Sequence, residues 1–257
     1  RCRLDGSELE RLSTGHWNAF GMTFDLAGNL FSTDNDPSGN PPNRLLHIVK
    51  GADFGYERRY GRSGRHPLVT WTGEFPGTLG MVTGLGEASC GIIPFGSNQL
   101  LVASWADNRV YLHSLEPRGS SFSAPRELFL SGTTSFRPVH FSYNYDASVL
   151  YFSDWVKGDY AVHGKGRIWR VELKKPIDLV PGPRQKKSVM THQEAFRNLG
   201  DSDPYVRTEA VGIIAQDPRE NWKAIENPIA RAHFAVALRR SSKPEALVHI
   251  ADLLDDP

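Results

Sequence analysis

NLFSTDN, residues Asn29 to Asn35, is an apolar run that ends in polar residues, and its pattern occurs twice more in the chain. The other copies are QLLVASW (Gln99 to Trp105) and VLYFSDW (Val149 to Trp155). Runs of this kind predict buried β-strands, and recurring strand pairs are typical of β-propeller blades, with a β-sandwich as the alternative. The predicted partner strands are LLHIV (Leu45 to Val49), RVYLHSL (Arg109 to Leu115) and GRIWRVEL (Gly166 to Leu173).

A closed propeller needs roughly four or more blades, and the repeat predicts only about three. The opening residues, RCRLDGSELERLSTG, resemble the outer edge of a preceding blade. We therefore expect the chain to be a fragment that holds the C-terminal part of a propeller, in residues 1–173.

From about residue 188 onwards the strand pattern gives way to helical periodicity. DPYVRTEAVGIIA (Asp203 to Ala215) and NPIARAHFAVALR (Asn227 to Arg239) each begin with a helix-capping residue and a proline. A third unit starts at KPEALVHIADLLDDP. These repeats predict HEAT-like helical pairs in residues 188–257, or else a small helical bundle, after a Pro- and Lys-rich linker at 174–187.

Composition excludes several classes of partner. The 257 residues hold 30 Lys and Arg against 29 Asp and Glu, for a net charge of +1, with no basic stripe. We therefore expect no nucleic-acid partner. The two cysteines cannot form a disulfide framework, and no apolar run approaches the length of a membrane span.

Three motifs give the first part a resemblance to a known family. They are GHWNAFGMTFDLAGNLFSTDNDPSGNPPNRLLHIVKGADFGY (Gly15 to Tyr56), GEASCGIIPF (Gly86 to Phe95) and FRPVHFSYNYDASVLYFSDW (Phe136 to Trp155). Residues 8–173 resemble the glucose/sorbosone dehydrogenase family of quinoprotein propellers. With the helical repeats, the chain looks like the planctomycete-type membrane-bound dehydrogenases, in which a cytochrome c domain often follows.

The resemblance implies a calcium ion beside pyrroloquinoline quinone, at the long loop that follows residue 35. In the family, carbonyl oxygens of a Gly-Pro pair hold the ion, and that pair falls on Asp36 and Pro37. Asp34 and Asn35 add oxygen ligands of the kind that calcium prefers. The alternative is an Asx-rich turn that binds no ion.

The resemblance also implies two cofactor contacts. Asn18 matches an asparagine that approaches the quinone, and Arg137 matches an arginine that contacts its carboxylates. Trp17 and Ala106 stand where the family has an arginine and a lysine, and losing these cations should weaken cofactor binding. The family's general-base histidine matches no residue of this chain, and His16 is not that residue, so we expect no catalytic residue here.

The implied function is that of a sugar or aldose dehydrogenase, with a sugar or polyol substrate and a cytochrome c domain as the electron acceptor. The resemblance implies a periplasmic or extracytoplasmic location, with association with a membrane as an option. It also implies that the helical repeats contact other proteins. The rival hypothesis is a propeller without redox chemistry that binds carbohydrate or protein, with Trp17, Trp105 and Trp155 stacking on sugars.

Overall fold

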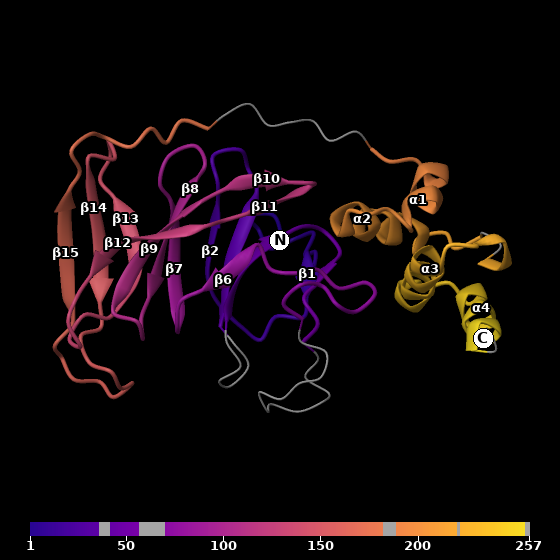
Figure 1. Cartoon of the computed structure of the whole chain (residues 1–257), viewed down its shortest axis with the longest axis horizontal. Coiled ribbons are helices and arrows are strands. Elements are labelled where there is room, and N and C mark those ends of the chain that lie inside the picture. Colours follow the sequence, from indigo (N-terminus) through magenta and orange to yellow (C-terminus); the bar gives the residue numbers. More distant parts are fainter. Residues whose placement is uncertain (36–41, 57–69, 182–188, 220–221, 255–257) are drawn as a thin grey trace.

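The structure, a computed structural model, describes residues 1–35, 42–56, 70–181, 189–219 and 222–254. A mainly β part comes first and a helical part follows it (Figure 1). Asp36 and Pro37 lie outside the described residues, so the structure does not test them as ligands.

Three antiparallel sheets follow one another along the chain and stand side by side (Figure 1). The first contains, in this order, β2 (Asn18–Phe24), β3 (Leu30–Asn35), β4 (Asn43–Ile48) and β6 (Thr83–Leu85). The second contains β7 (Ser89–Pro94), β8 (Gln99–Ser104), β9 (Arg109–Ser114) and β12 (Arg126–Ser131). The third contains β13 (Pro138–Tyr143), β14 (Val149–Asp154) and β15 (Arg167–Glu172). The recurring runs in the sequence are therefore strands β3, β8 and β14, and their predicted partners are β4, β9 and β15.

Two short strand pairs complete the β part. Strand β1 (Ser13–Thr14) pairs in parallel with β5 (Ala52–Asp53), and β10 (Glu116–Arg118) forms a hairpin with β11 (Ser121–Ser123). Residues 1–12 contain no strand, and the one strand in the opening fifteen residues is β1, so the outer blade edge expected there stays a prediction. Backbone turns hold this segment, such as the hydrogen bond from Gly6 N to Arg3 O, and leave Leu4 and Leu9 exposed.

The first strands of the three sheets are neighbours, because β2 contacts β7 and β7 contacts β13. Glycines allow the close approach. A Cβ atom on Gly21 would lie 2.3 Å from the carbonyl oxygen of Cys90, and one on Gly91 would lie 2.5 Å from that of Val139. No side chain fits at those distances, so main-chain atoms set the spacing between the sheets.

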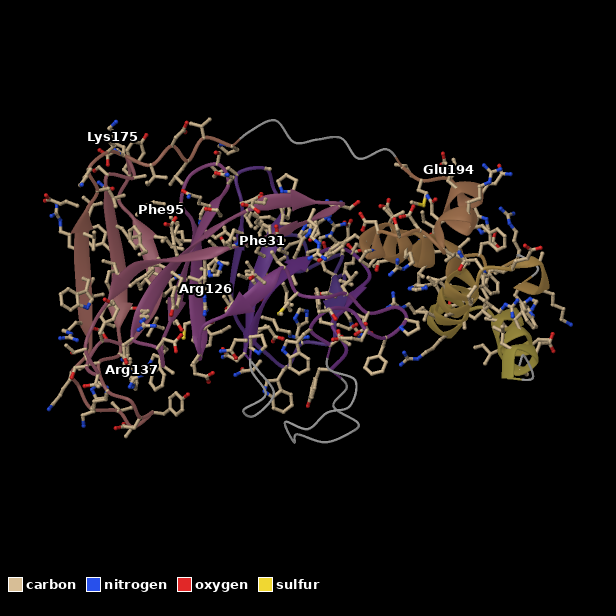
Figure 2. The ribbon with its side chains drawn as sticks, viewed as in Figure 1. Phe31, Phe95, Arg126, Arg137, Lys175 and Glu194 are labelled. Carbon is tan, nitrogen blue, oxygen red and sulfur yellow. The ribbon has the colours of Figure 1, made fainter. Side chains whose placement is uncertain are left out.

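The core lies between the sheets, where strands β3 and β8 are covered on both faces. Phe31, Leu100 and Leu101 are completely buried, which explains why these strands read as continuous apolar runs. Figure 2 shows Phe31 among the strands of the β part. The outer face of β2 differs, because Phe20, Met22 and Phe24 alternate along it and are each more than half exposed. No described residue covers this apolar face.

The helical part begins each of its first three helices with a side-chain cap. These helices are α1 (His192–Asn198), α2 (Pro204–Ile214) and α3 (Pro228–Arg240), and a fourth, α4 (Glu245–Leu254), follows. Asp203 and Asn227 cap α2 and α3, each followed by proline, as the sequence predicts. None of the helices in the described residues is long and apolar enough to cross a membrane.

The repeat in the helical sequence has a structural counterpart. Arg207 of α2 donates a hydrogen bond from Nη1 to the carbonyl oxygen of Asp201, 2.5 Å away. Arg231 of α3 donates from Nη2 to that of Ile225, 2.9 Å away. Each arginine therefore turns back to hold the loop six residues before it, at the entry to its own helix.

Helices α2 and α3 rest against strand β4 and loops of the β part. Arg240 donates to the carbonyl oxygens of Gly51 (3.0 Å) and Gly77 (3.2 Å). Tyr205 stacks on His47, with ring centroids 5.3 Å apart. The two parts therefore share a packed contact as well as the connecting segment.

Candidate functional site

A buried ion pair marks the end of strand β3. The Asp34 carboxylate and the Arg44 guanidinium are completely buried, and Oδ2 lies 2.5 Å from Nη2. Oδ1 of Asp34 accepts a hydrogen bond from the backbone N–H of Asn18, 2.9 Å away, and Trp17 N–H donates weakly to Oδ2. The carboxylate thus fixes the start of β2 and the start of β4 at once.

The third sheet repeats this arrangement at the end of β14. The buried Asp154 carboxylate accepts from the backbone N–H groups of Arg137 (2.7 Å) and Val156 (2.8 Å). Its Oδ2 accepts from Arg167 Nη2 (2.7 Å) and Trp169 Nε1 (2.8 Å). Burial alone would raise the pKa of Asp154, but these hydrogen bonds lower it, so the group is ionised at neutral pH.

The second sheet uses a carboxylate from a different position. Strand β8 ends in Ser104, and Asp107 in the following turn supplies the charge. Its Oδ2 accepts from Ser104 Oγ (2.9 Å) and from the backbone N–H of Glu87 (3.0 Å). In all three sheets, a carboxylate at the end of the second strand or just beyond it therefore holds the backbone at the start of the first strand or just before it.

Asn18 and Arg137, the two predicted cofactor contacts, occupy equivalent places in this scheme. Each donates its backbone N–H to the carboxylate at the end of the neighbouring strand. The Asn18 side chain is exposed, and Asn18 pairs across the sheet with Asn35. Oδ1 of Asn35 is buried and has no hydrogen-bond partner among the described residues, so its acceptor capacity is unused there.

Arg137 lies at one end of the third sheet (Figure 2). Its Nη1 donates to the carbonyl oxygens of Trp105 (3.0 Å) and Ala106 (2.9 Å). The guanidinium carbon sits 4.7 Å from the centroid of the Trp105 ring. Nε is buried and lacks a partner, so the guanidinium keeps hydrogen-bonding capacity for a further acceptor.

The tryptophans predicted to stack on sugars already have aromatic neighbours. Trp105 stacks on Tyr160 with centroids 5.4 Å apart, in addition to its contact with Arg137. Trp17 meets Tyr56 edge-on at 4.6 Å. Trp155 meets His163 edge-on at 5.0 Å. The three side chains therefore form separate aromatic pairs.

His16 is held as a neutral residue beside the Asp34 and Arg44 pair. Its Nε2 lies 2.8 Å from Ser13 Oγ, and its ring centroid lies 5.2 Å from that of Phe54. Burial lowers the pKa of His16, opposed by the charge of Asp34. Its described contacts are thus with Ser13 and Phe54 at this corner of the sheet.

The predicted calcium ligands Asp34 and Asn35 differ in their surroundings. Asp34 does not fit, because Arg44 neutralises its charge and a divalent cation would have to displace that guanidinium. Asn35 fits through its unpartnered oxygen. Within the described residues, no group of three or more His, Cys, Asp or Glu side chains could hold a metal ion.

Sequence reasoning missed the carboxylate brace that each sheet carries. Its signal was an acidic residue at the end of the second strand and an arginine at the start of the third, as in Asp34 with Arg44 and Asp154 with Arg167. The pairing depends on strand register, which fixes the opposing residues only once the turn length is known.

Comparison with known proteins supports the fold. No family model and no curated protein matches the chain. Among solved structures it is similar to an oxidoreductase described as a glucose dehydrogenase from Thermus thermophilus, with a TM-score of 0.50 and 23% identity over 65% of this chain and 48% of that one. An aldose sugar dehydrogenase from Streptomyces coelicolor, in its PQQ-bound form, gives a TM-score of 0.49 and 19% identity over 66% and 47% of the two chains. The chain shares the fold of the Thermus protein and spans about half the length of each of these structures.

Proposed function

We propose that this chain belongs to a quinoprotein sugar dehydrogenase-like oxidoreductase and supplies one wall of its pyrroloquinoline quinone pocket. The observation that carries the proposal is the similar placement of Asn18, the first residue of β2, and Arg137, which directly precedes β13, in two repeated sheets. The shared fold with a glucose dehydrogenase supports it by analogy.

The residues at hand suit an anionic cofactor better than a metal. Arg137 is fixed by two carbonyl oxygens and keeps an unpartnered Nε, and a guanidinium fork matches a carboxylate. Asn18 offers an exposed amide that can donate and accept. Calcium would be coordinated by the Asn35 side chain and by the backbone carbonyls of Asp36 and Pro37, and Asp34 would not be a ligand.

When bound, the quinone would accept hydride from a sugar carbon while the hydroxyl proton passes to a base. The residues of this chain anchor and orient the cofactor in that scheme. Asp34 and Asp154 keep the two anchoring segments in place through main-chain hydrogen bonds. No residue of this chain matches the family's general-base histidine, so the base is expected to come from another part of the protein.

The finer architecture belongs to the same proposal. Residues 1–173 would be three blades of a propeller, 174–187 a linker and 188–257 HEAT-like repeats, of the kind found in planctomycete-type membrane-bound dehydrogenases. The shared backward contacts of Arg207 and Arg231 support the repeat. The proposal also includes an extracytoplasmic location, a sugar or polyol substrate, a cytochrome c acceptor domain and a protein partner for the helices.

The test is a fluorescence titration of quinone into the protein that carries this chain, with calcium present. Arg137→Gln should weaken binding by about tenfold or more, because a charge-assisted hydrogen bond contributes roughly 1.5–3 kcal/mol. Arg170→Gln, at an exposed surface ion pair, is the matched control. Restoring the family's cations with Trp17→Arg and Ala106→Lys should tighten binding. If neither the parent nor this double variant binds quinone, the proposal fails.

A second candidate is a non-catalytic propeller that binds carbohydrate or protein. It is favoured by Trp17, which stands at the start of β2 where a cation is expected and packs against Tyr56. Glycan-array binding that survives Arg137→Gln, in a protein that does not bind quinone, would select this alternative.

A further inference from the structure

A buried histidine joins the helical part to the β part. His233 of α3 is 6% exposed, and its Nδ1 lies 2.7 Å from the carbonyl oxygen of Ile229, one turn earlier in the same helix. Because a carbonyl oxygen can only accept, the neutral ring carries its proton on Nδ1. The other ring nitrogen, Nε2, is therefore a hydrogen-bond acceptor.

Two N–H groups donate to Nε2 of His233. The backbone N–H of Gly77, in the β part, lies 3.3 Å from it, and Nε of Arg207, in α2, lies 3.2 Å from it. Arg207 is held in this position because its Nη1 donates to the carbonyl oxygens of Asp201 and Ser202. One acceptor nitrogen therefore links a loop of the β part to α2 and α3.

The surroundings of His233 oppose a positive charge on its ring. Burial lowers the pKa of His233 below its ordinary value of 6.5, and the hydrogen bond to Ile229 offsets only part of this effect. The guanidinium groups of Arg207 and Arg240 lower the pKa further. Arg240 has its own carboxylate nearby, since its Nη2 lies 3.9 Å from Asp53 Oδ2. The packed structure therefore favours the neutral ring.

The nearest wall of the junction offers no free counter-charge. Glu74 and His233 line the same cavity of about 330 Å³, but the Glu74 oxygens accept from the backbone N–H groups of Trp71 (3.2 Å) and Thr72 (3.3 Å). Among the residues that the structure describes, no carboxylate forms an ion pair with His233. A second proton on the ring would therefore be buried without compensation.

Protonation of His233 would also remove its contact with the β part. The proton would be added to Nε2, which would then donate instead of accept while facing the N–H groups of Gly77 and Arg207. Both hydrogen bonds would be lost, and the new charge would lie beside a guanidinium.

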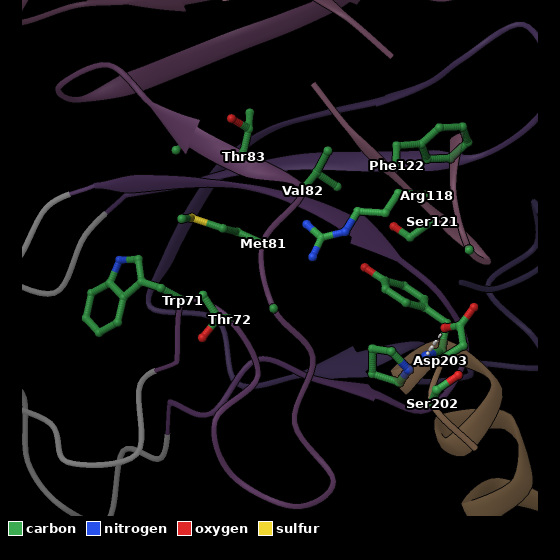
Figure 3. Close-up of a pocket in the computed structure, with 15 residues that line it drawn as sticks. Trp71, Thr72, Met81, Val82, Thr83, Arg118, Ser121, Phe122, Ser202 and Asp203 are labelled. Carbon is green, nitrogen blue, oxygen red and sulfur yellow. Dashed lines mark hydrogen bonds between the residues drawn. The ribbon is translucent and has the colours of Figure 1, made fainter. Parts of the chain in front are cut away.

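Open space interrupts the contact between the two parts. A cleft of about 520 Å³ lies between the stretch before β6, the hairpin β10–β11 and the start of α2 (Figure 3). The cavity beside Glu74 opens a second gap. Parts of a chain that meet over a small, interrupted interface are expected to move relative to each other. The loss of the contact at Gly77 should therefore shift the balance between a closed and an opened junction.

We propose that His233 makes this junction pH-sensitive: the neutral ring holds the helical part against the β part, and protonation of the ring opens the contact. The stabilising contribution is fully present above pH 6.5 and is lost as the pH falls, because the opened protein takes up the proton more readily. Opening would uncover Tyr205 of α2 and Val236 of α3, which lie against His47 and Gly77 of the β part.

Hydrogen exchange of the 257-residue chain, followed by NMR, tests the proposal. The reporters are two backbone amides that donate across the junction, Gly77 to His233 and Ser120 to Asp203 Oδ2, 2.6 Å away. Between about pH 7.5 and about pH 5.5, both should lose protection severalfold, up to about tenfold, after correction for intrinsic exchange. Burial opposes ionisation of Asp203, but the hydrogen bonds from Ser120 lower its pKa overall, so this second reporter does not itself titrate in that interval.

Two variants isolate the histidine. His233→Gln keeps an amide oxygen that accepts hydrogen bonds but does not titrate, so it should remove the severalfold change. His140→Gln, at an exposed histidine of β13, is the matched control and should behave as the parent. His47, which lies at the same junction, is present in all three proteins, so its contribution cancels.

The competing outcomes are distinct. Loss of protection at Gly77 alone would confine the effect to one hydrogen bond and overturn the opening of the junction. An equal pH dependence in the parent and in His233→Gln, or none in the parent, would also overturn it.

If His233→Gln does not fold, the parent decides the question through the ¹⁵N signals of its His233 ring. These should show the proton on Nδ1 at neutral pH and a pKa below 6.5. A proton on Nε2, or a pKa of 6.5 or above, would contradict the proposal. No readout involves quinone, so this proposal and the proposed function fail separately.

Discussion

Mild acid should destabilise this protein through His113, a completely buried residue of β9. Its Nδ1 lies 3.3 Å from the carbonyl oxygen of Ala124, which can only accept, so the neutral ring carries its proton on Nδ1. Nε2 is buried without a partner, and protonating it would leave a charged donor unsatisfied. Burial therefore lowers the pKa of His113 from 6.5 to about 4, opposed by the Ala124 carbonyl and assisted by Arg126.

The magnitude follows from the two pKa values. Above pH 6.5 both the folded and the unfolded states are neutral at this residue, and its stabilising contribution is fully present. As the pH falls below 6.5, only the unfolded chain gains the proton, so the free energy of unfolding decreases until the pH reaches about 4. The full difference corresponds to about 3 kcal/mol, and about 2 kcal/mol of it is lost between about pH 7.5 and about pH 5.

The assay is urea unfolding, followed by tryptophan fluorescence, at those two pH values. Burial also lowers the pKa values of His16 and His233, so the parent protein loses stability from several sites. His113→Asn isolates one of them, since an amide can donate to Ala124 but does not titrate. The variant should lose about 2 kcal/mol less than the parent over the same pH interval. An identical loss in both proteins would refute the assignment of a neutral, unpartnered His113.

Two further substitutions test the packing. Asp34→Asn should lower the free energy of unfolding by about 3–5 kcal/mol, because it leaves the buried Arg44 guanidinium without its counter-charge. Glu172→Gln, at a surface pair, should lower it by at most about 1 kcal/mol in the same denaturation experiment. Equal effects would mean that the buried pair does not brace the sheet. Gly77→Ala should loosen the contact between the two parts, because Gly77 has a φ of +79° and a Cβ atom there would lie 2.7 Å from the Val236 side chain. Limited trypsin digestion should then release β-rich and α-rich pieces sooner than in the parent protein. An unchanged digestion rate would contradict this.

The strands could be predicted because each repeats a local signal. Leu30, Leu100 and Leu150 occupy equivalent places in apolar runs, and all three are buried. The helix starts at Asp203 and Asn227 could be predicted for the same reason, since cap and proline are adjacent in sequence.

The site was harder to predict because its contacts depend on register and on distant segments. Asp34 is an attractive calcium ligand in sequence, but its partner Arg44 becomes visible only when β3 and β4 are aligned. Asp36 and Pro37 stay predictions.

The approach of Gly21 and Gly91 to neighbouring carbonyl oxygens has a consequence for how such a protein evolves. Since main-chain atoms set the distance between adjacent sheets at two points, exposed side chains of the sheets can be exchanged without altering that distance. Substitutions can accumulate as long as the glycines remain. Such a molecule can keep its architecture at 23% identity to a protein of the same fold, and distant relatives of this chain are better sought by the spacing of these glycines than by overall sequence similarity.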